Sequence, residues 1–298
     1  MASCLDALAC QTIAAEIVVV DNGPGEGCAD MLASRYPDVI RIDFGGKNLG
    51  FGAAINRAVA AYGKGPVILL NDDTVPEPDF VQNLVEVWDS GAIGMVAAVL
   101  LKVEKPDLID SAGIVCDRNL NAWDYLSGEP VATLRRAEDP LGPTGGGALF
   151  DRVAFTQVGG FDKRIFLYYE DLDLALRMRV IGITCRLAPN ARAHHAGSAT
   201  LGRHTAAKYR QTGFSRAFLL RKYGILRRPV PAFQVVLGDF TACLAQLALD
   251  HTVAGALGRM DGWKSAQRIN LLEVPTGYLE RPSLRRQLGV RLRRRRSS

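Results

Sequence analysis

Two segments of the sequence combine residue types that can do chemistry, and the first contains Glu170, Asp171 and Asp173. These acids follow a glycine turn and an aromatic run and open an expected helix, whose free N–H groups and dipole favour anions. We expect Asp171 to point toward the aromatic rings, where partial burial raises its pKa toward that of a working general base. We expect Asp173 and Arg177 to pair on the exposed face of the helix. The alternative interpretation is an ordinary helix start with acids near the dipole.

The second segment is Asn71-Asp72-Asp73, which follows the apolar run Val67–Leu70. A strand end that presents carboxylates is unfavourable unless a cation is bound there, and hard oxygen ligands suit Mg²⁺ or Mn²⁺ on a diphosphate. The alternative is a turn with Asx capping before Pro76. The sequence thus offers a candidate base and a candidate metal site, and the surrounding elements must bring the two together.

Apolar runs of strand length alternate with helical segments along the chain. Runs such as Ile17–Val20 suit strands buried on both faces, and the alternation predicts a parallel sheet with right-handed crossovers. Ligands bind at the carboxyl edge of such a sheet, where Asp21 and Asn71 follow their strands. Residues 104–140 are expected to be irregular. The expected strands are 17–20, 39–44, 67–70, 94–101 and 184–189, and the expected helices are 3–11, 29–35, 52–61, 76–88, 209–223 and 233–257.

The composition is that of a soluble globular protein, with 48% hydrophobic and 22% charged residues. Eight arginines and no acid lie within residues 281–296. This tail contributes +8 to the net charge of +5, so the rest of the chain carries a net charge of −3. The basic character therefore does not indicate nucleic-acid binding. Six scattered cysteines, no signal peptide and no uninterrupted apolar run indicate a cytoplasmic protein. The 233–257 helix is expected to be too polar to span a bilayer.

The letters GGFD, an aromatic run and YYEDLDLALRMR resemble the GGFD–aromatic–ED–DL–R signature of family 2 glycosyltransferases. These are inverting enzymes with a GT-A fold. The resemblance covers about residues 3–225 and implies Asp171 as the catalytic base. It implies an α/β fold with a Rossmann-like, mostly parallel sheet flanked by helices over residues 1–225. A helical extension and Arg-rich tail follow over residues 226–298.

The resemblance also implies a nucleotide site made from two segments. The Asp of the family's VDN segment contacts the nucleotide base, and that position is Asp21 here. The segment 47–56 is similar to the family's NxGFxxAxN motif under the nucleotide, where glycines allow a close approach and Lys47 can meet the diphosphate. Turn and glycine-loop roles are the alternatives. The implied nucleotide-binding residues are Asp21, Asn22, Lys47, Asn48, Gly50 and Asp72.

The implied metal site takes the place of the family's DxD motif, with Asn71 at its first position as in rhamnosyltransferase-like members. This implies Asp73 as the metal ligand, with Asp72 nearer the sugar or ribose. A paired His194 and His195 before Gly-Ser resembles a family element in which a histidine meets the metal or diphosphate. His194 aligns better, but the sequence does not decide between the two. The implied acceptor-binding residues are Gly146, Gly147, Tyr169 and Glu170.

The family normally places another strand before the first helix, and this sequence begins inside that helix. Either the true start lies upstream or the protein lacks this strand. In both cases part of the base-binding pocket is in doubt, and we expect an unpaired strand edge or a gap in the sheet.

The implied function is inverting transfer of a sugar, with rhamnose favoured, from a nucleotide-diphosphate donor such as dTDP-rhamnose. The acceptor is expected to be a saccharide or a polyprenyl-linked saccharide in cell-envelope polysaccharide synthesis. The amphipathic 233–257 helix and the Arg-rich tail are together a candidate peripheral contact with the inner face of the plasma membrane, and the alternative is a solvated, disordered tail. The alternatives are a sugar nucleotidyltransferase, for which no basic pyrophosphate loop is visible, and a catalytically degenerate sugar-nucleotide-binding protein.

Overall fold

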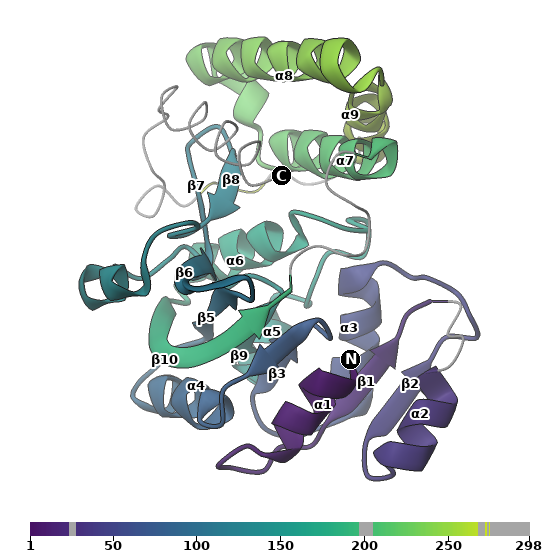
Figure 1. Cartoon of the computed structure of the whole chain (residues 1–298). Coiled ribbons are helices and arrows are strands. Elements are labelled where there is room, and N and C mark those ends of the chain that lie inside the picture. The colour runs from purple at the N-terminus through teal and green to yellow at the C-terminus, as the bar shows by residue number, and fades with distance from the viewer. Residues whose placement is uncertain (24–27, 197–204, 268–271, 273, 275–298) are drawn as a thin grey trace.

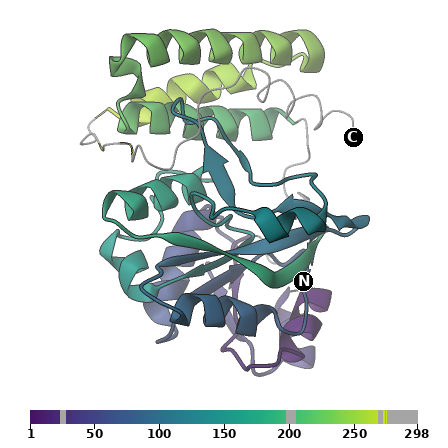
Figure 2. The ribbon, with the colours of Figure 1, turned by 90° about the vertical axis from the view of Figure 1, so that its left-hand side faces the viewer.

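The computed structural model describes residues 1–23, 28–196, 205–267, 272 and 274 and shows a sheet region beneath a layer of helices (Figures 1 and 2). Gly197-Ser198 and the Arg-rich tail lie outside the described residues. The helices are α1 (Ala2–Ala9), α2 (Cys28–Arg35), α3 (Phe51–Ala61), α4 (Phe80–Asp89), α5 (Arg152–Gln157), α6 (Glu170–Val180), α7 (Ala206–Lys222), α8 (Pro229–Asp250) and α9 (Ala254–Ser265), with 3₁₀ turns η1 (Val131–Arg136) and η2 (Ile225–Arg227). The strands are β1 (Val18–Asp21), β2 (Ile40–Asp43), β3 (Val67–Leu70), β4 (Thr74–Pro76), β5 (Met95–Lys102), β6 (Lys105–Ser111), β7 (Ile114–Cys116), β8 (Ala122–Asp124), β9 (Gly147–Phe150) and β10 (Cys185–His195).

The central sheet has the strand order β3-β9-β5-β10-β4, with β6 beside β5. Strands β3, β5 and β10 run in one direction, but among the described pairings of this sheet only that of β5 with β10 is parallel. Strands β9, β6 and β4 are antiparallel to their neighbours, so the sheet is mixed and not mostly parallel as expected. The chain leaves β5 at its carboxyl end and returns to β9 without a crossover helix. A strand that starts at the end of the sheet where the previous strand finished must run antiparallel to it. A parallel strand would need a crossover connection back to the opposite end of the sheet.

The excursion between β5 and β9 is more regular than expected, because residues 104–140 contain β6, the β7–β8 hairpin and η1. Ile109 is fully buried and β7 is buried along its length. The prediction of an irregular segment was therefore wrong. These strands are short and bend where the ladder shifts register, so their apolar residues show no period that a sequence reading can detect.

Strands β1 and β2 pair in parallel as a separate two-stranded unit. Among the described strands, nothing joins β1 to β3, although residues of both line the same cleft. This is the gap in the sheet that the sequence led us to expect. The unpaired edge of β1 therefore lies beside the region where the chemistry-bearing residues gather.

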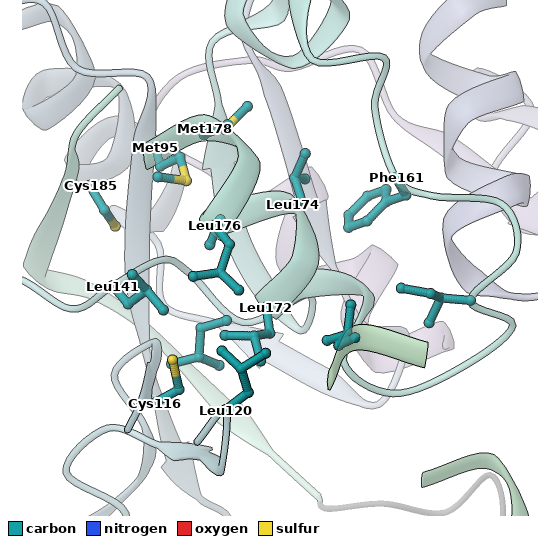
Figure 3. Packing of buried hydrophobic residues seen from close by; sticks show 14 of the residues in the cluster. Met95, Cys116, Leu120, Leu141, Phe161, Leu172, Leu174, Leu176, Met178 and Cys185 are labelled. Atoms are coloured by element: carbon teal, nitrogen blue, oxygen red, sulfur yellow. The ribbon is translucent and has the colours of Figure 1, made fainter. Parts of the chain in front are cut away.

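The main core surrounds α6, whose Leu174 and Met178 are fully buried and lie close to Phe161 and Met95 (Figure 3). The expected pair between Asp173 and Arg177 is present at 2.8 Å. Its expected exposure was wrong, because Asp173 is completely buried. Helix α7 covers this side of α6, and Lys222 of α7 lies 2.7 Å from the Asp173 carboxylate.

The helical layer consists of α7, α8 and α9, of which α7 and α9 pack extensively against each other. The single helix expected over residues 233–257 is instead divided at His251, which takes a left-handed backbone conformation (φ 49°). Helix α8 starts at Pro229, which adds apolar residues to the segment. By length and composition it is apolar enough to cross a membrane, which corrects the expectation that it is too polar.

Helix α4 begins later than the 76–88 segment predicts. Residues Thr74–Pro76 form β4, which pairs with the end of β10, and the Glu77 N–H donates to the carbonyl of Arg192. The helix therefore starts at Phe80. The antiparallel pairing of β4 with β10 fixes the backbone directly after Asp73.

Candidate active site

A cleft of about 1960 Å³ opens at the carboxyl ends of β1 and β3 and is bounded by the start of α6 and by the helical layer. Both chemistry-bearing segments reach it, since Asp73 and Asp171 line the same cleft. The cleft therefore brings the candidate metal site and the candidate base together.

The start of α6 is reached through two consecutive left-handed residues, Tyr168 (φ 66°) and Tyr169 (φ 67°). Such backbone is uncommon for residues other than glycine. It turns the chain sharply, so that Glu170 and Asp171 follow directly as the first residues of the helix. Sharp, strained turns of this kind concentrate at functional sites, where surrounding structure holds them.

Asp171 lies at the cleft with both oxygens engaged by backbone groups. Its Oδ1 accepts from the N–H of Leu172 (2.8 Å) and its Oδ2 from the N–H of Gly145 (3.4 Å). Burial disfavours the charged form and raises the pKa of Asp171 to about 6. A carboxylate with this pKa is ionised at neutral pH and still basic enough to accept a proton.

Glu170 is buried beside Asp171, and its Oε2 has no hydrogen-bond partner among the described residues. Burial and then the negative charge of Asp171 raise the pKa of Glu170 to about 8. At neutral pH Glu170 is therefore mostly protonated while Asp171 is mostly ionised. Two neighbouring carboxyls whose pKa values are pushed apart in this way can hold different roles.

The second cluster is formed by Asp73, His195 and Asp110. The Nε2 of His195 lies 3.4 Å from the Oδ1 of Asp73, and its Nδ1 lies 2.7 Å from the Oδ2 of Asp110. The hydrogen bond to Asp110 raises the pKa of His195. The Oδ1 of Asp73 is buried and accepts no hydrogen bond from the described residues. A buried carboxylate oxygen that accepts no hydrogen bond and faces a histidine nitrogen is a suitable start for a metal site.

The structure separates the two histidines, because successive residues of a strand point to opposite faces. His195 points toward Asp73, whereas His194 lies 3.6 Å from Glu77 and does not line the cleft. The pairing of β10 with β4 therefore brings His195 to the candidate metal site and keeps the better-aligned His194 away from it.

The expected nucleotide residues are held by a local network. The carboxylate of Asp21 accepts two hydrogen bonds from Arg41 (2.8 and 3.2 Å). The amide of Asn22 accepts from the N–H of Leu49 (2.8 Å) and donates to the carbonyl of Gly50 (3.1 Å). These contacts fasten the loop before α3 to the end of β1.

Most of the residues singled out from the sequence line the cleft, and three do not. Lys47 is an exposed residue outside the cleft lining, and Gly147 is buried inside β9, where an added Cβ would contact Leu100. His194 is the third. The residues that do line the cleft are Asp21, Asn22, Asn48, Gly50, Asp72, Asp73, Gly146, Tyr169, Glu170 and Asp171.

Sequence reasoning missed Asp110, which lines the cleft and contacts His195, and Arg41, which lies outside the cleft lining and holds the cleft residue Asp21. Asp110 lies on β6, in the segment that was expected to be irregular. Arg41 lies on β2, and its alternation with apolar neighbours is the signal that could have shown that it faces away from the core. Trp123 and Asp124 of β8 also line the cleft.

The cleft lies at the carboxyl ends of strands in a mixed α/β sheet. It holds a carboxylate with a raised pKa and, opposite it, an Asp–His pair. This arrangement is that of a GT-A glycosyltransferase. Comparison with known proteins agrees, because the sequence model described as Glycosyl transferase family 2 matches residues 1–159. The chain belongs to glycosyl transferase family 2, as the sequence resemblance indicated, and it is a glycosyltransferase.

Two further comparisons place the chain among known proteins. The N-acetylglucosaminyl-diphospho-decaprenol L-rhamnosyltransferase of Mycobacterium tuberculosis (strain H37Rv) is 30% identical over 227 residues, covering 66% of this chain and 72% of that protein. The mannosyltransferase PcManGT of Pyrobaculum calidifontis, solved with GDP-Man and Mn²⁺, has a TM-score of 0.53 at 18% identity, covering 91% of this chain and 72% of that chain. S. aureus TarS 1–349 has a TM-score of 0.54 at 12% identity, covering 88% and 74%. The two structural likenesses establish the GT-A fold.

Proposed function

We propose that the chain transfers a rhamnosyl group from a dTDP-rhamnose-type donor to a polyprenyl-diphosphate-linked saccharide, in cell-envelope polysaccharide synthesis. The observation that carries the proposal is the shared cleft, in which the Asp171 carboxylate opens into the same space as Asp73 and His195. The choice of sugar and acceptor is supported by the 30% identity to a protein named for L-rhamnosyl transfer to N-acetylglucosaminyl-diphospho-decaprenol.

In the proposed reaction an acceptor hydroxyl attacks the anomeric carbon of the donor in line with the leaving diphosphate. Its proton passes to Asp171 as the new C–O bond forms. The bond between the anomeric carbon and the diphosphate oxygen breaks, and the nucleoside diphosphate leaves with the electron pair. One displacement inverts the anomeric configuration and needs no covalent intermediate. Gly145 orients the base through its N–H.

The donor set at Asp73 fits a divalent cation that is shared with a substrate. Among the described residues, no group of three or more acidic, histidine or cysteine side chains could hold an ion. Asp73 offers a buried, unpartnered oxygen and His195 offers Nε2, with Asp110 orienting the ring. Mg²⁺ and Mn²⁺ commonly take one or two protein ligands plus phosphate oxygens. When bound, the ion supplies electrostatic stabilisation of the leaving diphosphate.

The direct test of the base is the substitution Asp171→Asn, which keeps the shape of the side chain but removes its proton-accepting ability. We expect turnover to fall by about 10²–10⁴-fold. Nucleotide binding, followed by thermal shift, should be retained, because the base does not hold the donor. The anomeric configuration of the wild-type product, determined by NMR, should be inverted. An Asp171→Asn protein with wild-type turnover would sink the assignment.

The donor site is tested by thermal shift with dTDP, UDP and GDP, each with and without Mn²⁺. We expect Mn²⁺-dependent stabilisation by dTDP, and a loss of its metal dependence in His195→Ala. His194→Ala is the matched control, because this neighbour in β10 lies outside the cleft lining and should respond like the wild type. The opposite pattern in the two variants would place the ligand at His194, and stabilisation by another nucleotide would change the donor.

The proposed site of action is the cytoplasmic side of the plasma membrane, where a polyprenyl-linked acceptor is anchored. The sequence places eight arginines in residues 281–296, which can contact anionic lipid. The domain division at residue 225 remains a proposal, and the packing of α7 on α9 shows that the helical layer uses residues from both sides of it.

A further inference from the structure

Helix α8 has its polar and apolar faces arranged in the opposite way to an ordinary surface helix. A helix at a protein surface normally turns its apolar face to the core and its polar face to solvent. In α8 only Val235 is buried, while both acids of the helix point inward. Asp239 contacts Arg216 (2.7 Å) and Asp250 accepts from the hydroxyl of Tyr209 (2.8 Å).

The outward side of α8 is a continuous apolar stripe. Its members follow one another at intervals of three or four residues, so they share one face of the helix. Each is about half to two-thirds exposed, and Phe233, at 70%, is the most exposed of them. We name the stripe by its six residues: Val230, Phe233, Leu237, Phe240, Leu244 and Leu247.

The helix is the outermost element of the helical layer in both views (Figures 1 and 2). A contiguous apolar surface on such an element indicates an apolar partner. The inward ion pair of Asp239 with the buried Arg216 fixes which side of α8 faces the protein. Although α8 is long enough to cross a bilayer, this attachment along one side favours a position flat on a membrane surface.

The positive charge next to the stripe favours an anionic membrane over a second copy of the chain as its partner. Arg227 and Arg228 precede α8, are exposed, and make no ion pair with the described residues. The stripe itself contains no acid, and the sequence adds eight arginines in residues 281–296. Two copies of such a surface would bring like charges together, whereas anionic headgroups complement the basic residues.

The inward side of α8 faces the active site. Ala242, Gln246 and Leu249 line the same cleft as Asp171. A membrane on the outer side of α8 therefore places the cleft within the thickness of one helix from the lipid surface. This step rests on the proposed function, because only a lipid-linked acceptor makes that distance useful.

We propose that α8 is the membrane-binding helix of the protein. It lies in the headgroup region of an anionic bilayer, with its apolar stripe inserted among the lipids. Arg227 and Arg228 contact the headgroups beside it. In this position α8 brings the cleft close to a sugar that is carried on a polyprenyl diphosphate in the same membrane. The stripe supplies the insertion.

The test uses the full chain and co-sedimentation with vesicles of phosphatidylcholine that contain about 30% phosphatidylglycerol, whose anionic headgroups attract basic segments. The test variant combines Phe233→Gln, Phe240→Gln and Leu244→Gln, which are all exposed positions. The matched control combines Val103→Gln, Val153→Gln and Val180→Gln, which are exposed apolar residues outside the helical layer. We expect the test variant to lose about tenfold or more in vesicle affinity and the control to bind like the wild type.

Removing residues 281–298 separates the stripe from the tail. We expect this deletion to weaken binding and flatten its salt dependence while leaving measurable binding to the same vesicles. The indole fluorescence of a Phe240→Trp variant should shift to shorter wavelength on vesicles and be quenched by brominated lipid. Unchanged binding of the glutamine variant, or no change in the fluorescence of the Phe240→Trp variant on bound vesicles, would overturn the proposal.

Light scattering tests the remaining alternative, in which a second copy of the chain covers the stripe. A wild-type dimer that becomes monomeric in the glutamine variant, without vesicle binding by either protein, would show that a second copy covers the stripe and would overturn the membrane proposal. Vesicle binding requires neither donor nor acceptor. Its failure is therefore distinct from failure of the rhamnosyl transfer, which the Asp171→Asn and nucleotide experiments address.

Discussion

At the residue scale, adjacent carboxyls with different surroundings define the candidate chemistry. Asp171 is held by two backbone N–H groups and opens on the cleft, whereas Glu170 is buried with an unpartnered oxygen. Their pKa values of about 6 and about 8 leave one ionised and the other protonated at neutral pH. The structure thus supports Asp171 as the base and leaves Glu170 as a candidate hydrogen-bond donor to the acceptor.

The pH dependence of kcat/KM follows from the base. Because only ionised Asp171 can accept a proton, we expect activity to rise with pH through an apparent pKa near 6 and to fall again as Glu170, the candidate donor, ionises at about 8. Glu170→Gln should leave this acidic limb in place, since Glu170 is already neutral at that pH. A limb that disappears in Glu170→Gln would assign the titration to Glu170.

Glu170 also predicts a pH dependence of stability. Its folded-state pKa is raised from 4.5 to about 8, so the folded protein binds more protons than the unfolded chain between these values. Its contribution is therefore fully present below pH 4.5 and is lost as the pH rises through 8. We expect the free energy of unfolding of Glu170→Gln, measured in urea, to decline less than that of the wild type over this window. Parallel declines would show that Glu170 ionises freely in the fold.

At the scale of elements, α6 is held by buried charges as well as by apolar contacts. Asp173 contacts Arg177 (2.8 Å), Lys222 of α7 (2.7 Å) and the hydroxyl of Tyr223 (3.1 Å). Lys222 also reaches Asp162 of the GGFD turn (2.9 Å). Asp173, which was expected on the exposed face of the helix, therefore joins α6 to α7, and Lys222 extends the contact to the GGFD turn.

The buried network predicts a large stability effect. We expect Asp173→Ala to lower the free energy of unfolding by about 3–5 kcal/mol, because it leaves buried cations without their partner. Asp6→Ala is the control, since Asp6 pairs with Arg35 where both side chains are more than half exposed. Its effect should stay below about 1 kcal/mol. Urea unfolding measures both, and equal losses would contradict the buried network.

Another element-scale contact explains the GGFD turn. The side-chain amide of Asn56 donates to the carbonyl of Phe161 and accepts from its N–H, both at 2.8 Å. Gly160 takes a left-handed conformation (φ 65°), and an added Cβ would collide with the Asn56 oxygen. The Asn at the end of the NxGFxxAxN segment and the glycine of GGFD thus belong to one contact between α3 and the turn before α6.

At the scale of the whole molecule, the cleft lies between two separate sheets and a helical layer. The β1–β2 unit is paired only within itself among the described strands, whereas β5 is buried along nearly its whole length. A nucleotide that reaches from Asp21 to Asp73 must bridge the two sheets. The binding energy is therefore expected to be partly used in ordering β1 and β2.

Hydrogen exchange tests this bridging. With dTDP and Mn²⁺ we expect slower amide exchange in residues 18–21 and 40–43, because the ligand restricts local opening of a weakly connected unit. Residues 95–102 of β5 are the internal control and should be unaffected. Protection confined to the Asp73 turn would mean that the nucleotide does not use β1.

The sequence by itself determined the family signature, the candidate base, the metal-site turn and most of the helices and strands around them. These features are local: Glu170-Asp171 opens a helix, Asn71-Asp72-Asp73 ends a strand, and short-range periodicity reports both. Tertiary structure alone decided that His195 rather than His194 faces Asp73, because the direction of a strand residue depends on its partners. It also supplied Asp110, 85 residues away from His195, and the burial of Asp173 under α7. It decided as well that α8 turns its apolar stripe outward, since the contacts of Asp239 with Arg216 and of Asp250 with Tyr209 select the face that meets the protein.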